Sequence, residues 1–440
     1  MSFSNIMDSN SYTGGSVGRH GDGLIEARER MLGPAYRLFY RKPVHLVRGE
    51  GSHLFDADGV RYLDAYNNVA SVGHCHPHVV DAVMRQMTSI NTHTRYLHDG
   101  IVDYSDRLLG TLGADIDQVM YACTGSEAND LALRVAAMHT GATGVIVTNE
   151  AYHGNTQAVT AISPSNGGPA VLGPHVRTVP PPDSRQPGPT AEVFADHVRR
   201  AADELQAAGF GVSCLVVDTI FSSDGVLAER DTLAPAVAAV RERGAVFIAD
   251  EVQPGFGRTG EAMWGFDRHG VRPDIVTMGK PMGNGLPVSA MAVRSAVLER
   301  FATTQPYFNT FGGNPVSMAA AAAVLDVIES DELPAHALRI GARLREGIAG
   351  IATDHAAVDD IRGTGLYIGV EIVTDDGAPD RQRARAIVEA MRDAHVLISV
   401  CGEHGNVLKI RPPLVFSDSD VDWFCTALDS ALAATLMTVG

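Results

Sequence analysis

Cysteine is scarce in this sequence, and its spacing argues against a disulfide framework. The 440 residues include five cysteines, and no two of them are separated by only two residues. An odd number of widely spaced cysteines is typical of free thiols in a reducing compartment. We therefore expect a cytoplasmic protein.

Long apolar runs and an excess of basic residues are also lacking. No segment reaches the ~18 consecutive apolar residues of a membrane helix. The polar start of the chain, MSFSNIMDSNSYTGGSVGRHGDG, has no apolar run like that of a signal peptide and predicts a loose arm. The 35 basic residues are outnumbered by 52 acidic ones, a formal net charge of −17. Neither nucleic acid nor an anionic membrane is an expected partner, so an anionic ligand must be held by local donors.

Short apolar segments alternate with amphipathic ones through the middle of the chain. Buried strands are predicted at residues 144–150, 214–218, 247–250 and 274–278, and an amphipathic helical stretch at 226–243. This alternation predicts an α/β fold with a mostly parallel central sheet covered on both faces. Ligands of such sheets bind beyond the carboxyl ends of the strands, where Asp218, Asp250 and Glu251 fall.

The two ends of the chain follow a different pattern. Residues 163–190 are rich in proline and glycine and predict a long surface loop. After residue 330, helices are predicted at 336–352, 380–395 and 418–436, and strands at 368–373, 397–400 and 407–410. We predict an N-terminal arm with part of a small α+β domain (1–75), a large domain (76–329) and the rest of the small domain (330–440).

Three segments carry the main chemical candidates. In ACTGSEANDLALRVA, a glycine turn opens a helix, so backbone N–H groups near Gly125 and Ser126 could receive a phosphate. In IADEVQPGFGRTG, Asp250 falls at a strand end, where a carboxylate could keep a pyridine nitrogen protonated. In DIVTMGKPMGNGLPVSA, glycines flank Lys280, which a cofactor site could activate by desolvation. An ordinary capped helix start, a solvated acid and a surface lysine are the alternatives.

Two shorter segments add further candidates. AYHGNT places Tyr152 and His153 after a strand, where an aromatic face could stack on a ring or simply pack in the core. FNTFGGNP offers the hydroxyl of Thr310 to a phosphate, or a plain turn. None of the five segments is decisive alone.

In this order, the segments resemble the class III aminotransferase family, pyridoxal-phosphate (PLP) enzymes of fold type I. The resemblance runs from about residue 40 to the end and is carried by TGSEAN, DEVQPGFGRTG, MGKPMGNGLPV and NTFGGNP. It implies a PLP cofactor and a homodimer with shared active sites, and it leaves a tetramer open. The roles it implies are the cofactor phosphate for Gly125 and Ser126, ring stacking for Tyr152, the ring nitrogen for Asp250, the ring hydroxyl for Gln253, the Schiff base for Lys280 and the neighbouring subunit's cofactor phosphate for Thr310.

Three positions depart from family members that use 2-oxoglutarate. Asn155 stands where many of them carry an arginine for a distal carboxylate, and Lys409 stands where an arginine takes the α-carboxylate. Ser223 replaces the glutamate that pairs with that arginine. Because asparagine is neutral and lysine is a point charge, the bidentate carboxylate grip is missing.

A narrower resemblance, to the ethanolamine-phosphate phospho-lyase branch, rests on YNNVASVGHCHP, NTHTRYLHD and NVLKIRPPLVF. It implies elimination of phosphate from O-phosphoethanolamine, a small phosphorylated amine, or from a phosphorylated hydroxylysine. With O-phosphoethanolamine the other products are acetaldehyde and ammonia. We hypothesise that Arg95 and His98 bind the leaving phosphate, with Asn67 and Asn68 nearby and with Lys409 and Arg411 as weaker candidates. A structural or surface ion pair is the alternative for Arg95.

Two other functions stay open: an ω-transaminase that passes an amino group to pyruvate, and a PLP-fold protein that acts only as a regulatory or binding module. The cluster His74, Cys75, His76 and His78 predicts a structural loop rather than a metal site, because adjacent residues rarely converge on one ion. GFGRTG lacks the spacing and the following helix of a dinucleotide-binding motif.

Overall fold

The computed structural model describes residues 10–15 and 19–436, and a seven-stranded sheet forms its centre. The strand order is β4-β10-β9-β8-β7-β5-β6. The strands are β4 Gln118–Ala122, β5 Val145–Thr148, β6 Val176–Val179, β7 Cys214–Asp218, β8 Val246–Asp250, β9 Ile275–Met278 and β10 Ser289–Val293. Neighbours from β6 to β9 pair in parallel, and β10 runs antiparallel to both of its neighbours. The predicted mostly parallel sheet is confirmed.

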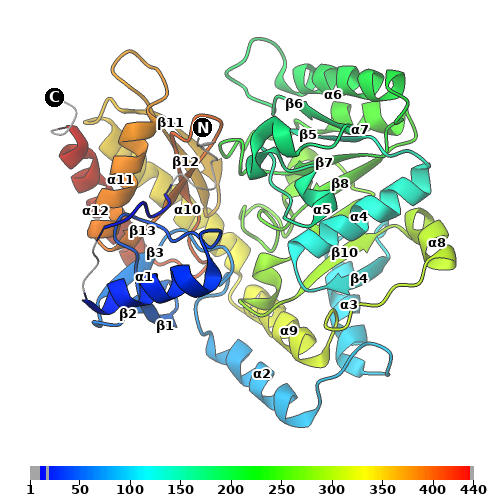
Figure 1. The fold of residues 1–440 in the computed structure, drawn as a ribbon, viewed down its shortest axis with the longest axis horizontal. Coiled ribbons are helices and arrows are strands. Elements are labelled where there is room, and N and C mark those ends of the chain that lie inside the picture. Colours follow the sequence, from blue (N-terminus) through cyan, green and yellow to red (C-terminus); the bar gives the residue numbers. More distant parts are fainter. Residues whose placement is uncertain (1–9, 16–18, 437–440) are drawn as a thin grey trace.

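Helices pack on both faces of this sheet because its strands are apolar on both sides (Figure 1). Leu215 and Val217 of β7 belong to the core beneath α6 and α7, whereas Val216 belongs to the core beneath α4 and α8. The helices of this part are α2 Pro77–Ser89, α3 Asp99–Gly110, α4 Gly125–Thr140, α5 Gln157–Thr160, α6 Thr190–Ala207, α7 Ala234–Arg241, α8 Ser295–Thr304 and α9 Pro315–Ser330.

A smaller α+β unit, on the left of Figure 1, is built from both ends of the chain. Its two four-stranded sheets have the orders β1-β2-β3-β13 and β11-β12-β15-β14. The elements are β1 Leu46–Glu50, β2 His53–Asp56, β3 Arg61–Asp64, β11 Val358–Thr364, β12 Tyr367–Ile372, β13 Val396–Leu397, β14 Ser399–Cys401, β15 Val407–Ile410, α10 Leu333–Ala352, α11 Arg381–Asp393 and α12 Asp418–Leu436. Leu63 of β3 pairs in parallel with Val396 of β13, so the predicted contribution of both termini is confirmed. The boundaries at residues 75 and 330 stay predictions.

The helix predicted across 226–243 is wrong in its first half. Only α7 is helical there, since Val226 and Asp231 have positive φ angles of 62° and 57°, which interrupt a helix. Pro235 lies in the first turn of α7, where the missing N–H costs nothing.

The prediction of a single loop over 163–190 is also wrong. It contains β6, which lies at the edge of the central sheet and pairs only with β5. An edge strand needs partners on one side, so Pro174 and Pro180 can flank it without breaking the sheet. A strand of four residues, with a proline close to each end, gave too short a signal in the sequence.

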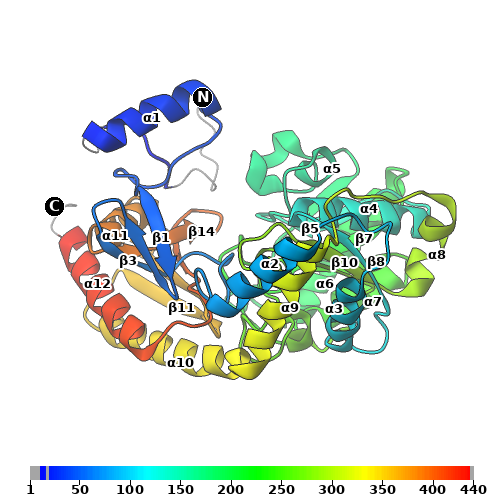
Figure 2. The same cartoon turned by 90° about the horizontal axis from the view of Figure 1, so that it is seen from below.

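The start of the chain contains a helix that the sequence patterns did not indicate. This helix, α1 Arg19–Leu32, stands apart from both small sheets in Figure 2. The predicted loose arm falls partly on residues 1–9 and 16–18, which lie outside the described residues. Among the described helices, none combines the length and apolar character needed to cross a membrane.

Candidate active site

A cavity of about 370 Å³ opens beyond the carboxyl ends of β7, β8 and β9. Its walls include six residues predicted to bind the cofactor: Gly125, Ser126, Tyr152, Asp250, Gln253 and Lys280. These residues come from four separate segments of the sequence, so the fold brings the predicted motifs together at one place.

One wall of the cavity is the start of α4. Thr124 accepts a hydrogen bond from the Glu127 N–H at 3.1 Å, and the Glu127 carboxylate accepts one from the Thr124 N–H at 2.9 Å. This reciprocal cap uses neither the N–H of Gly125 nor that of Ser126, and both residues line the cavity. Free N–H groups at the positive end of a helix dipole suit a phosphate.

The turn at Gly154 packs directly against this helix start. Gly154 has φ +139°, and a Cβ there would lie 2.4 Å from the Ser126 Oγ. Ser126 donates its hydroxyl to the Asn155 Oδ1 and accepts the Asn155 N–H, both at 3.1 Å. Asn155, at the position where other members carry an arginine, therefore supports Ser126.

Asp250 is held in a fixed orientation at the end of β8. Its Oδ2 accepts hydrogen bonds from the His153 Nδ1 at 2.7 Å and from the Asn129 Nδ2 at 2.9 Å. Asn129 in turn accepts a hydrogen bond from Thr277 at 2.7 Å. The sequence analysis missed Asn129, although it lies one helical turn after Gly125 and so faces the same way.

Lys280 is the lysine of this cavity. Burial lowers the pKa of Lys280 to about 8; Arg411 and Lys409 lower it too, while Asp250 and Asp218 oppose the shift. The chain has only three lysines among its 35 basic residues, and Lys280 and Lys409 are two of them. An amine with a lowered pKa is partly neutral near pH 8 and can act as a nucleophile or base.

Two buried cations lie close behind the cavity wall. Lys409 and Arg411, on and just after β15, are 8% and 6% exposed. Neither forms an ion pair with a carboxylate of the described chain. The Lys409 Nζ lies 5.7 Å from the ring centroid of Tyr367, and Arg411 bonds to Gln253, which lines the cavity. The structure thus places these two weaker phosphate candidates behind the cavity wall, and neither is among the described residues that line the cavity.

Three further predicted residues do not line this cavity in the single chain: Arg95 and His98, predicted for the substrate phosphate, and Thr310, predicted for the cofactor phosphate of a neighbouring subunit. Arg95 is exposed over the ring of Phe308, and His98 caps α3 by accepting the Gly100 N–H at 3.2 Å. Thr310 is exposed on a loop outside the cavity. All three therefore need a neighbouring subunit to act as predicted.

The two predicted asparagines have local roles. Asn68 is buried and donates to the backbone oxygen of Gln253 at 3.0 Å, and its Oδ1 has no partner among the described residues. Asn67 accepts the Val69 N–H at 2.9 Å and donates its own N–H to Asp64 at 2.8 Å. Asn68 therefore supports the cavity wall at Gln253, whereas Asn67 shapes its own turn.

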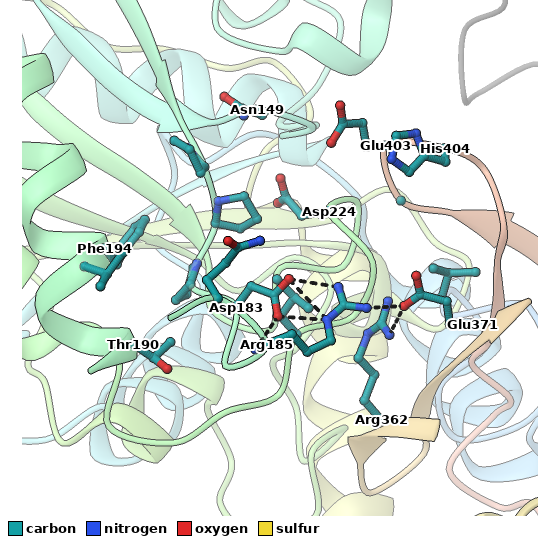
Figure 3. A pocket seen from close by; sticks show the side chains of 18 of the residues that line it. Asn149, Asp183, Arg185, Thr190, Phe194, Asp224, Arg362, Glu371, Glu403 and His404 are labelled. Atoms are coloured by element: carbon teal, nitrogen blue, oxygen red, sulfur yellow. Dashed lines mark hydrogen bonds and ion pairs between the residues drawn. The ribbon is translucent and has the colours of Figure 1, made fainter. Parts of the chain in front are cut away.

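A second, larger cavity of about 590 Å³ lies between the loop after β6 and the small sheet (Figure 3). Its cations are neutralised. Arg185 binds Asp183 through two parallel hydrogen bonds of 2.9 and 2.8 Å and also bonds to Glu371, which Arg362 shares. Such a network ties two parts of a fold together and leaves both arginines paired with acids.

The histidines near residue 76 serve separate structures. His74 bonds to Asp64 at 2.7 Å and His78 bonds to Asp326 at 2.8 Å. Within residues 10–15 and 19–436, no group of three or more histidine, cysteine or acidic side chains could hold a metal ion.

The smaller cavity fits pyridoxal phosphate. A helix start suits its phosphate, the clamped Asp250 suits a protonated ring nitrogen, and the amine of Lys280 suits its aldehyde. Fold and cavity together define a PLP-dependent enzyme of fold type I.

Comparison with known proteins narrows this class. The sequence model of Aminotransferase class-III matches residues 39–432, and the chain belongs to that family. It is 39% identical over 430 residues to a Drosophila melanogaster alanine–glyoxylate aminotransferase 2-like protein, covering 94% of this chain and 87% of that one. It is 35% identical to ethanolamine-phosphate phospho-lyase homolog 1 of Caenorhabditis elegans, covering 94% and 93%. A phospholyase from Arthrobacter, solved in complex with phosphoethanolamine, superposes with a TM-score of 0.90 at 41% identity, covering 93% and 99%.

Proposed function

We propose that this protein is a phospho-lyase that eliminates phosphate from O-phosphoethanolamine. The observation that carries the proposal is the pair of buried cations, Lys409 and Arg411, which lack a carboxylate partner in the described chain and shift the pKa of Lys280. A buried cation without a counter-charge is costly unless a ligand supplies the charge. A phosphate dianion on the substrate would supply it.

The comparisons support the same substrate class. The Arthrobacter phospholyase was solved with phosphoethanolamine, and its similarity extends over 93% of this chain. The neutral Asn155 and Ser223 remove the features that other members use for a dicarboxylate. A small phosphorylated amine is therefore the substrate that best suits this pocket.

The residues divide the chemistry between them. Bound PLP supplies an electron sink for the carbon that loses its proton. Lys280 removes that proton from the carbon that bears the substrate's nitrogen. The Asp250 carboxylate would keep the ring nitrogen of the cofactor protonated. The adjacent carbon–oxygen bond then breaks and phosphate leaves with the bonding electrons. Water completes the balance, so one O-phosphoethanolamine and one water give acetaldehyde, ammonia and phosphate.

The test is incubation of the holoenzyme with O-phosphoethanolamine and no keto acid. The proposal predicts release of phosphate and acetaldehyde in equal amounts, measured by a phosphate assay and by coupled reduction of the aldehyde. No phosphate release under conditions where the cofactor is bound would contradict it.

A transaminase is the second candidate function, and a specific observation favours it. Several relatives, including the Drosophila protein, are named as alanine–glyoxylate aminotransferase 2 or its homologues. An ω-transaminase would need added pyruvate or another oxo acid and would release no phosphate. A regulatory module would instead lack an absorbance band from cofactor bound at Lys280.

We also propose a homodimer as the active unit. Large apolar side chains stand exposed on α2 and on the two loops near residues 96 and 311: Met84, Met87, Tyr96, Leu97 and Phe311. Exposed apolar patches of this kind mark interfaces. The same loops carry Arg95, His98 and Thr310, so a partner subunit would bring them to an active site. Sedimentation of Leu97→Glu should show monomers with reduced activity, and an unchanged dimer would contradict this interface.

A further inference from the structure

Arg411 is a buried cation whose side-chain hydrogen-bond acceptors, within the part of the chain that the structure describes, are all uncharged. Its Nε donates to the backbone oxygen of Tyr66 at 3.1 Å, and its Nη1 donates to the Gln253 Oε1 and to the Tyr367 hydroxyl, the latter at 3.4 Å. The rings of Tyr66 and Tyr367 lie 4.9 and 5.6 Å from the guanidinium carbon. The group is therefore held firmly in place without being neutralised.

Gln253 connects Arg411 to a carboxylate through a chain of hydrogen bonds. The Gln253 Nε2 donates to the Ser222 Oγ at 2.6 Å. The Ser222 hydroxyl donates to the Oδ2 of Asp218, at the end of β7. Asp218 also accepts the Ile220 N–H at 3.1 Å and lines the cavity. The nearest acid on this path is thus separated from Arg411 by an amide and a hydroxyl.

We propose that the relay of Asp218, Ser222 and Gln253 positions Arg411 while leaving its charge for the substrate, and so selects a dianionic leaving group. This inference rests on the proposed function. An amide oxygen can orient a guanidinium as a carboxylate does, but it brings no negative charge. A direct ion pair would instead cancel the positive potential that attracts a phosphate dianion.

The proposal explains why Gln253 uses both ends of its side chain. An amide has two donor hydrogens and an acceptor oxygen, so it can accept from Arg411 and donate to Ser222 at the same time. A glutamate could accept at both ends but could not donate to Ser222. Ser222 is therefore a positioning residue, since it acts through Gln253 and Arg411, whereas Gln253 has this role in addition to its predicted contact with the cofactor.

Binding of inorganic phosphate to the holoenzyme tests the relay directly. The cofactor fills its own phosphate site, so titration calorimetry would report the substrate site. Gln253→Glu should weaken phosphate binding roughly tenfold or more, because it places a carboxylate on Arg411. Ser222→Ala should weaken it about threefold, and Ser222→Thr should restore it because threonine keeps the hydroxyl. Unchanged binding in Gln253→Glu and Ser222→Ala would overturn the proposal.

A matched control separates this effect from added charge alone. Gln186→Glu makes the same chemical change on the wall of the larger cavity, where Gln186 is exposed, and should leave phosphate binding unchanged. An equal loss in Gln186→Glu would overturn the relay. If Gln253→Glu does not load the cofactor, Ser222→Ala and Ser222→Thr decide the outcome.

Steady-state kinetics add a readout that a purely structural role would not move. Gln253→Glu should raise the KM for O-phosphoethanolamine more than it lowers kcat. Wild-type protein that binds phosphate through the relay but releases none from O-phosphoethanolamine would refute the proposed function and leave the anion site standing. Phosphate release that does not depend on Gln253 or Ser222 would refute the relay and leave the proposed function standing.

Discussion

The two cavities differ in how the cations at or close to them are balanced. At the larger one, Arg185 and Arg362 share Glu371 (Figure 3), and each has a further acidic partner, Asp183 for Arg185 and Asp360 for Arg362. At the smaller one, among the described residues, Lys409 lies over an aromatic ring, and Arg411 contacts aromatic rings and uncharged oxygens. The larger cavity therefore holds its arginines in ion pairs, whereas the smaller one has two buried cations close to it that lack an acidic partner among the described residues.

The physical reason for the difference is the cost of burial. A buried pair can be roughly neutral in its effect on stability, but a buried charge without a partner is strongly unfavourable. A fold keeps such a charge where function requires it, because local rules are broken mainly at functional sites. Arg185 and Arg362 each have acidic partners, as the cost of burying a charge requires. Lys409 is buried and has no such partner among the described residues.

The largest effect should come from Lys280→Ala. Removal of the only amine that lines the smaller cavity should lower turnover at least ~1000-fold, while thermal unfolding stays close to wild type. In the wild-type holoenzyme, borohydride reduction followed by peptide mapping should find the cofactor attached to Lys280 and to neither of the other two lysines of the chain. Retained turnover would remove Lys280 from the mechanism.

The next largest effect should come from Lys409→Met, which tests the unbalanced side of the comparison. Methionine keeps the length and apolar stem of lysine but removes its charge. We expect KM for O-phosphoethanolamine to rise roughly 10- to 100-fold with a smaller change in kcat, since a charge-assisted contact is lost. An unchanged KM would mean that Lys409 does not face the phosphate.

A third prediction concerns pH. Burial lowers the pKa of Lys280 to about 8. Only the neutral amine can capture the cofactor, so the rate of PLP capture by apoprotein should rise with pH through a midpoint near 8. Stopped-flow absorbance would measure it. A midpoint near the ordinary lysine value of 10.5 would show that neither burial nor the neighbouring cations lower the pKa of Lys280.

The smallest effect should come from Arg185→Met, on the balanced side. Arg185 has a side chain 45% exposed, so its ion pairs should contribute at most ~1 kcal/mol to the free energy of unfolding. Urea denaturation should show this loss, and KM for O-phosphoethanolamine should stay unchanged. A KM increase as large as that of Lys409→Met would break the distinction between the two cavities.

Much of the fold was predictable because its signals are strong and local. The four apolar runs of the middle region are the strands β5, β7, β8 and β9, and Asp250 at the end of β8 lines the cavity. The edge strand β6 and the short helix α7 were not predictable in the same way. A four-residue strand between prolines and a helix interrupted by positive φ angles leave too little periodicity.

The site was predictable only as far as its motifs extend. Gly125, Ser126, Tyr152, Gln253 and Lys280 line one cavity as the resemblance implied. Their supports were not visible in the sequence, because contacts such as Asn129 with Asp250 join residues that are distant in the chain. The placement of Lys409 and Arg411 likewise depends on β12 and β15 pairing in register.

The parallel pairing of β3 with β13 has a consequence for how the protein is made. Leu63 leaves the ribosome early, but its partner Val396 emerges only near the end of synthesis. The N-terminal hairpin must therefore wait with an open edge while the central sheet completes. A nascent chain stopped before residue 396 should combine a folded central sheet with an N-terminal sheet whose β3 edge is still unpaired. We therefore expect the need for chaperones to be greatest late in translation.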